Sequence, residues 1–265
     1  GEASRQKGDI QATKDLWLPL STGPDDLYRA KAGLALTSLE LDKKEIDMDK
    51  AIDRLEGLRY AWRGDELETA INARLGKLYI EKGDHMKGLT LLRQAASLAP
   101  ESDQAKQIKE SMVETFRTLF MTDALKKISP IDAVAIYDEF SDLAPQGDEG
   151  DKLTRNIAER LVDADLLPRA ENLLQHQVDN RLQEREGAAV ALRLASLQVL
   201  DGKPDKALET LAKAEAFLSR VSPDLAAPDR RQIALLRARA LADLKKPEEA
   251  FAALALQTQE PDVLR

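Results

Sequence analysis

The sequence predicts an all-α protein, an α-solenoid in which about six helical hairpins stack into a right-handed superhelix. The main observation is a small residue that recurs every 37 to 45 positions, with a larger apolar residue four positions after it. The small residues are Ala51, Gly88, Ala133, Ala170, Ala207 and Ala250, and the larger ones are Leu55, Leu92, Tyr137, Leu174, Leu211 and Leu254. Such spacing is typical of helical hairpins that pack closely on one another.

Composition supports the same fold class. Of the 265 residues, 32% are charged and 4% are aromatic, and alanine and leucine, both strong helix formers, are abundant. No long alternation of valine, isoleucine and threonine predicts a strand. No apolar run approaches the ~20 residues that a membrane span needs, so we expect no direct insertion into a membrane.

The first elements are a lone helix and a hairpin. Residues 1–24 are predicted to hold the second helix of a truncated preceding repeat, with Trp17 on its apolar face. The solenoid proper is predicted to span 25–265, and its first hairpin covers about 25–65. Its first helix has two registers, with either Gly33 or Leu39 at the close-contact position. We favour Gly33, which makes 41–48 a loop.

The hairpin at 69–102 has the clearest pattern. Gly83 suits the left-handed residue that closes a helix, and Pro100 cannot continue one. The pattern consists of Leu75, Gly76, Tyr79, Gly88, Leu92, Ala95 and Pro100. It resembles the tetratricopeptide repeat (TPR), except that Asn72 stands where that family usually has tryptophan and Leu92 replaces phenylalanine. The resemblance implies a non-catalytic protein that holds a protein or peptide on its surface.

Four weaker hairpins follow at about 114–147, 151–184, 188–221 and 231–264. In the first of them Phe140 fills a place that the TPR family keeps small, which predicts wider packing. The stretch 103–113 keeps a helical spacing and is predicted to extend a helix. The stretch 222–229 is predicted to be a loop that ends at a cap, Asp229. Both ends of the chain look cut from a longer protein.

The residues that catalysis or metal binding would need are missing from the pattern. The chain has no cysteine, which excludes disulfides, thiolate metal sites and cysteine nucleophiles. Neither His85 nor His176 has a second histidine one helical turn away, and no glycine-rich phosphate loop occurs. We therefore expect no enzyme, no cofactor and no metal site.

The TPR resemblance also implies where a partner would bind. In that family the first helix of each hairpin lines a concave groove, and the matching positions here are predicted partner contacts. They are Lys77, Thr118, Thr122, Arg155, Glu159, Leu192, Ser196 and Arg239. The apolar stretch 189–199 has two interpretations, groove surface or packing between neighbouring repeats. Arg155 and Asn156 stand alone, so the family's clamp for a C-terminal carboxylate is not expected.

Charge narrows the partner class. The net charge is −8 and no basic stripe is present, so we expect no nucleic-acid partner. Carboxylates are dense between residues 132 and 165. This density indicates either solvated helix faces or a docking patch for a basic partner. We expect a scaffold for protein–protein interaction within a longer, bacterial protein. The alternative is a structural spacer or self-assembly segment of a large envelope protein. The first residues are polar and carry no signal peptide, but a chain cut from a longer protein would lack any targeting segment. The sequence therefore leaves localisation open between the bacterial envelope or periplasm and the cytoplasm.

Overall fold

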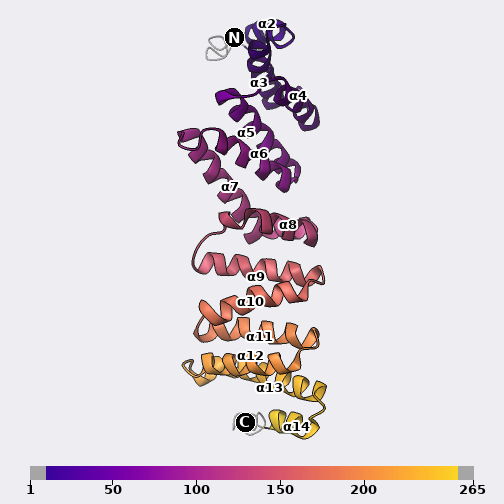
Figure 1. Cartoon of the computed structure of the whole chain (residues 1–265), viewed down its shortest axis with the longest axis vertical. Helices are drawn as coiled ribbons and strands as arrows, with labels where there is room; N and C mark the ends of the chain where they lie inside the picture. Colours follow the sequence, from indigo (N-terminus) through magenta and orange to yellow (C-terminus); the bar gives the residue numbers. More distant parts are fainter. Residues whose placement is uncertain (1–9, 256–265) are drawn as a thin grey trace. The chain divides into compact units, whose positions relative to one another are not determined.

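The computed structural model describes residues 10–255, and in this range the chain consists of helices and short connections without a strand (Figure 1). The α-helices are α2 (Ile10–Ser21), α3 (Asp26–Asp42), α4 (Met48–Ala61), α5 (Asp65–Lys82), α6 (His85–Leu98), α7 (Asp103–Met121), α8 (Pro130–Phe140), α9 (Asp148–Asp163), α10 (Leu167–Asn180), α11 (Glu184–Leu200), α12 (Pro204–Leu218), α13 (Pro223–Asp243) and α14 (Pro247–Ala255). Two short 3₁₀ helices, η1 (Asp123–Lys127) and η2 (Ser141–Leu143), flank α8.

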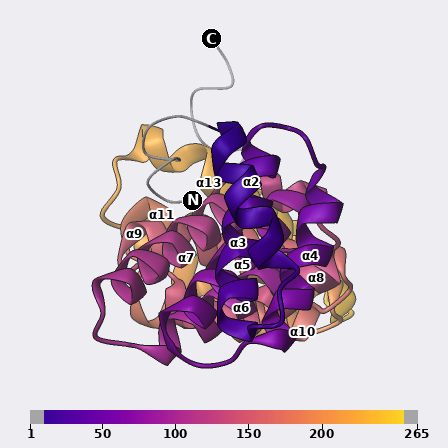
Figure 2. The same cartoon turned by 90° about the horizontal axis from the view of Figure 1, so that it is seen from above.

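The described chain divides into two compact units. Unit 1 comprises residues 10–118 together with Glu139–Leu143, and unit 2 comprises residues 119–138 and 144–255. In unit 1, α2 lies against α3, and α3/α4 and α5/α6 are antiparallel pairs (Figures 1 and 2). In unit 2, α9/α10, α11/α12 and α13/α14 are the corresponding pairs. The predicted fold class, an all-α solenoid of TPR-like hairpins, is confirmed.

Small residues set the close approach between the two helices of a hairpin. In α5/α6, a Cβ added to Gly88 would lie 2.5 Å from Cγ1 of Ile80 and 2.7 Å from the carbonyl oxygen of Gly76. No side chain fits in that gap, so both positions require glycine or a shift of one helix. Gly83 closes α5 with a φ of +96°, the left-handed conformation that glycine adopts without strain.

The other members of the recurring small–large pattern occupy the same structural place. Ala51, Ala133, Ala170 and Ala207 are completely buried in the second helices of their hairpins. Most of their larger partners are also buried: Leu55, Leu92, Leu174 and Leu211. The pattern weakens in α14, where Leu254 is 39% exposed.

Of the two predicted loops, the one at 41–48 is present and slightly shorter, because α3 ends at Asp42 and α4 begins at Met48. Gly33 lies at the close contact with α4, as the favoured register predicts, and an added Cβ would lie 2.9 Å from the methyl groups of Leu58. The loop predicted at 222–229 is wrong, because α13 begins at Pro223 and continues through Pro228. Ala226 is completely buried in this first part of α13, and its packing offsets the hydrogen bond that Pro228 cannot donate. The stretch 103–113 is helical, as predicted.

Ion pairs join successive hairpins at a separation of about one repeat. In most of them the acid precedes the base along the chain. The pairs with their N–O distances are Asp42–Arg74 (3.0 Å) and Asp49–Lys82 (2.5 Å) in unit 1, and Asp138–Arg169 (2.6 Å), Glu159–Arg193 (2.5 Å), Glu171–Lys203 (3.1 Å) and Asp179–Lys213 (2.6 Å) in unit 2. At these junctions the earlier hairpin presents a carboxylate and the later one an amine or a guanidinium group, whereas Arg155 and Glu186 pair in the opposite order.

Candidate partner-binding face

The first helices of three hairpins in unit 2 are linked, α9 to α11 by ion pairs and α11 to α13 by packing. Helix α11 packs on its own partner α12 and also on α13, the first helix of the next hairpin. We call the exposed and half-buried residues that α9, α11 and α13 present on one side the first-helix face. It consists of Arg155, Glu159, Ala189, Arg193, Ser196, Arg231, Leu235 and Arg239. Packing on α12 and α13 holds α11, which carries the middle of this face, in place.

Charges on the first part of this face are neutralised between helices. The guanidinium Nη2 of Arg155 donates to Oε1 of Glu186 at 2.8 Å, and Nε of Arg193 donates to Oε1 of Glu159 at 2.7 Å. The hydrogen bond with Glu159 raises the pKa of Arg193. Of the predicted partner contacts, Arg155 and Glu159 thus already have oppositely charged neighbours. A partner would have to compete with Glu186 and Arg193 for them.

The apolar stretch of α11 mostly faces inward. Leu192 is only 2% exposed, and Val190 and Leu194 are buried with it. Burial supports packing between repeats as the interpretation of 189–199. Ser196 is half-buried, whereas Arg239 on α13 leaves 70% of its side chain exposed.

The three remaining predicted contacts lie elsewhere. Thr122, in unit 2, caps η1, because its Oγ1 accepts a hydrogen bond from the backbone N–H of Ala124 at 3.2 Å. Thr118, in unit 1, donates to Oε1 of Glu114 at 3.4 Å. Lys77 is exposed on α5, also in unit 1. Contact of these residues with a partner stays a prediction.

A pocket of about 600 Å³ lies in unit 2 where the end of α7 and η1 meet α9. Its lining includes Met121, Thr122, Leu125, Glu159 and Arg160. Two side chains of α9 hold these segments together: Asn156 Nδ2 donates to the carbonyl of Phe120 at 2.8 Å, and Arg160 Nη2 donates to the carbonyl of Ile128 at 2.6 Å. Asn156 therefore has a structural partner. The pattern of small residues did not reveal η1 or this pocket.

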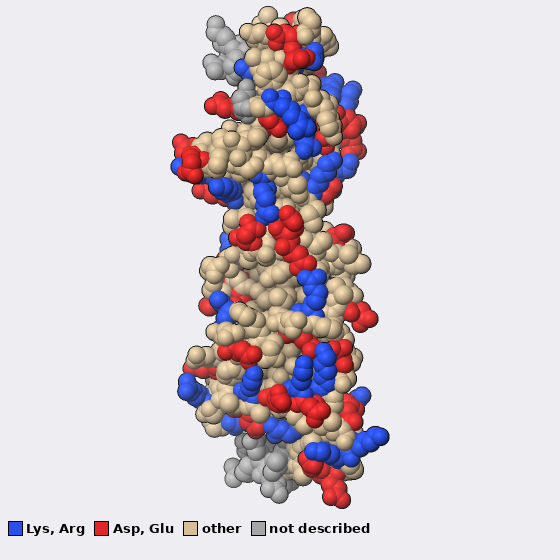
Figure 3. Space-filling view, viewed as in Figure 1, with Lys and Arg blue, Asp and Glu red and all other residues tan. Residues whose placement is uncertain are grey.

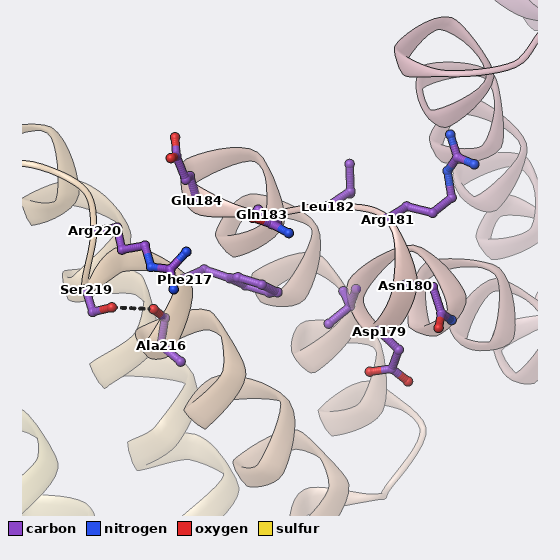
Figure 4. A pocket seen from close by; sticks show the side chains of 11 residues that line it. Asp179, Asn180, Arg181, Leu182, Gln183, Glu184, Ala216, Phe217, Ser219 and Arg220 are labelled. Carbon is purple, nitrogen blue, oxygen red and sulfur yellow. Dashed lines mark hydrogen bonds between the residues drawn. The ribbon is translucent and has the colours of Figure 1, made fainter.

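A second pocket in unit 2, of about 520 Å³, lies between the α10–α11 connection and the end of α12 (Figure 4). Phe217, Val178 and Leu182 give it an apolar part. Arg181 points away from Phe217 in this view and binds Asp151, with Nε 2.6 Å from Oδ1. Asp179 binds Lys213, and this hydrogen bond lowers the pKa of the carboxyl group. The sequence pattern did not single out this pocket.

Five carboxylates of the acidic segment 132–165 pair with arginines outside it. In unit 2, Asp138 pairs with Arg169 and Asp151 with Arg181. In unit 1, Arg93 binds both Glu139 and Asp142. Red and blue atoms accordingly lie next to one another over much of the surface in Figure 3. This pairing favours ordinary helix faces over a docking patch for a basic partner.

The described residues contain no group of three or more histidine or acidic side chains that could hold a metal ion. His85 is engaged with its own turn, with Nδ1 2.9 Å from the carbonyl oxygen of Gly83. In the range 10–255, no helix has both the length and the apolar character to cross a membrane.

Comparison with known proteins identifies the fold. No family model and no curated protein matches the chain. The solved structure of Naa15/Naa10 bound to HypK-THB matches with a TM-score of 0.52 and 17% identity, over 98% of this chain and 35% of that one. BtubC (BKLC) from P. vanneervenii matches with a TM-score of 0.42 and 17% identity, over 87% of this chain and 90% of that one. The TPR2AB domain of yeast Sti1 in complex with pHSP90 matches with a TM-score of 0.37 and 20% identity, over 90% of this chain and 93% of that one.

These identities are low, so the similarity concerns the fold alone. The match to the Naa15 complex extends over nearly the whole chain but only about a third of the larger protein. Together with the hairpins described above, it places the chain among TPR-like helical repeats.

Proposed function

We propose that this chain is a non-catalytic scaffold for protein–protein interaction, and that it binds a segment of a partner along the first-helix face of unit 2. The observation that carries the proposal is the exposure of Leu235 in the middle of α13. This leucine is 63% exposed, although the opposite side of the same helix is buried. A large apolar side chain that the chain itself leaves uncovered can serve as an anchor for a partner.

The fold supports the same class of function. Helical repeats build extended surfaces from hairpins that contact only their neighbours, and such surfaces commonly hold peptides or helices. One solved structure that shares this fold, Naa15/Naa10 bound to HypK-THB, is a complex of proteins.

Site-specific photo-cross-linking tests this function. A benzoylphenylalanine at Ser196, on the face, is compared with one at Lys206, an exposed position on α12. We expect one partner to be cross-linked from Ser196 and not from Lys206. Loss of that cross-link in Leu235→Asp, with unchanged helicity, would link the partner to α13. Equal cross-linking from both positions would contradict binding along the first-helix face.

Self-assembly is the second candidate, because α2 in unit 1 exposes three leucines, Leu16, Leu18 and Leu20. Self-association through α2 would bury them. Light scattering over a range of protein concentrations distinguishes this role, since a strict monomer at high concentration excludes it.

A further inference from the structure

We infer that α13 recognises an acidic amphipathic segment of a partner protein. In this segment one carboxylate lies one helical turn before an apolar side chain, and a second carboxylate lies one helical turn after it. This inference rests on the proposed binding along the first-helix face and names the chemistry of the partner. The recognition element is an Arg–Leu–Arg stripe, formed by Arg231, Leu235 and Arg239.

The spacing places the three side chains on one line. Residues four apart lie on the same side of a helix, so the stripe extends over ~12 Å along α13. All three side chains are exposed. The opposite side of α13 is buried through Ile233, Ala234, Ala238 and Leu241. Since packing on α11, α12 and α14 fixes the helix, the stripe is presented without rearrangement.

The arginines of the stripe differ from their neighbours in unit 2. Arg155 and Arg193 have carboxylates from the adjacent first helix, and Arg237 on α13 itself binds Glu215 at 2.6 Å. Within the part of the chain that the structure describes, Arg231 has no carboxylate within 4.0 Å. Arg239 reaches only Asp243, at 3.4 Å and one turn along the same helix. An exposed pair of that kind is worth little free energy.

The positive charge of the stripe therefore favours a partner that carries carboxylates. Guanidinium groups bind carboxylates through charge-assisted, often bidentate hydrogen bonds. A partner helix with the order Glu-x-x-x-Leu-x-x-x-Glu repeats the spacing of the stripe, so its leucine can cover Leu235 while each glutamate meets an arginine. A phosphate backbone is a poorer occupant, since the whole chain carries a net charge of −8.

Fluorescence anisotropy with two labelled helical peptides tests the inference on the full chain. The peptides are alanine-based and differ only in carrying Glu-x-x-x-Leu-x-x-x-Glu or Lys-x-x-x-Leu-x-x-x-Lys. We expect the glutamate peptide to bind and the lysine peptide not to bind. We further expect the double variant Arg231→Glu with Arg239→Glu to weaken binding of the glutamate peptide at least about tenfold and to allow the lysine peptide to bind.

A matched control separates the stripe from overall charge. Lys206→Glu with Arg220→Glu changes the net charge by the same amount at two exposed positions of unit 2 outside the stripe, and circular dichroism verifies that each variant is folded. Equal loss of binding in this control variant, equal binding of both peptides, or displacement of the glutamate peptide by a single-stranded oligonucleotide would overturn the inference.

The experiment also separates this inference from the proposed function. A partner that cross-links at Ser196 but is insensitive to reversal of Arg231 and Arg239 leaves the scaffold function standing and overturns acidic recognition. Binding of the glutamate peptide without a cross-linked partner at Ser196 supports recognition by α13 and contradicts binding along α11.

Discussion

At the scale of single residues, Asn72 on α5 is a buried polar side chain with an unsatisfied acceptor. It is 2% exposed, and its Oδ1 has no hydrogen-bond partner. A buried acceptor without a donor loses its hydration without compensation. Leucine has the same branched arrangement of side-chain heavy atoms and no polar atom, although its two methyl groups take more space. We therefore expect Asn72→Leu to raise the free energy of unfolding by about 1–2 kcal/mol.

Urea denaturation followed by tryptophan fluorescence measures this effect, since both tryptophans, Trp17 and Trp62, lie in unit 1. The control is Asn72→Asp, which places a charge in the same site and should lower stability. A less stable Asn72→Leu protein would show that the amide has a favourable partner.

Another residue-scale prediction concerns pH. In unit 1 the hydroxyl of Tyr79 donates to Glu56 Oε1 at 2.9 Å, and Lys87 Nζ lies 2.6 Å from that hydroxyl and 2.9 Å from the carboxylate. Burial opposes ionisation of Glu56, but the hydrogen bonds from Lys87 and Tyr79 outweigh it and lower the pKa of the carboxyl group. The hydrogen bonds to Tyr79 and Glu56 raise the pKa of Lys87.

Because the pKa of Glu56 is lower in the folded state, its ionised carboxylate stabilises the fold at pH values above the ordinary pKa of glutamate. This contribution is lost as the pH falls through the folded-state pKa. The contribution of Lys87 is lost only as the pH rises through its raised pKa, so it stays constant in acid. The urea midpoint of unit 1 should thus fall between about pH 6 and pH 3, and it should fall less in Glu56→Gln. Parallel curves for the two proteins would show that Glu56 does not contribute.

At the scale of elements, contact between the two helices of a hairpin depends on alanine at the close-approach position. Ala207 is completely buried in α12, whereas Ala212 on the same helix is exposed. We expect Ala207→Leu to overpack the α11/α12 contact and to lower stability by about 1–3 kcal/mol. The matched change Ala212→Leu should have little effect. Equal thermal unfolding of the two variants would contradict the assigned register.

Element positions were predictable where local chemistry and packing agree. Gly83 closes α5 as its sequence context predicts, and the buried alanines lie where their spacing places them. Pro223 and Pro228 indicated a loop, but burial of Ala226 against other elements keeps this segment helical. Sequence register also assigned Arg155 and Glu159 to the first helices. Their pairing with Glu186 and Arg193 depends on side chains one repeat away, which a pattern of apolar residues does not report.

At the scale of the whole molecule, the two units offer separate spectroscopic signals. Tryptophan fluorescence reports unit 1 alone, whereas far-ultraviolet circular dichroism reports helices in both units. Because hairpins of a solenoid contact mainly their neighbours, a change in one hairpin weakens distant ones less than near ones. In Ala207→Leu we therefore expect the circular dichroism midpoint to move more than the fluorescence midpoint. Identical shifts would show that both units unfold as one cooperative body.

The ion pairs between successive hairpins have a consequence for how such a repeat chain can evolve. Gene duplication or exchange of a hairpin preserves its apolar faces, yet it also brings a new set of charges to each junction. At Glu171 and Lys203, or at Asp179 and Lys213, a foreign neighbour with the opposite order would set acid against acid. At these two junctions, tolerated insertions should therefore be those that carry a base toward the earlier hairpin and an acid toward the later one.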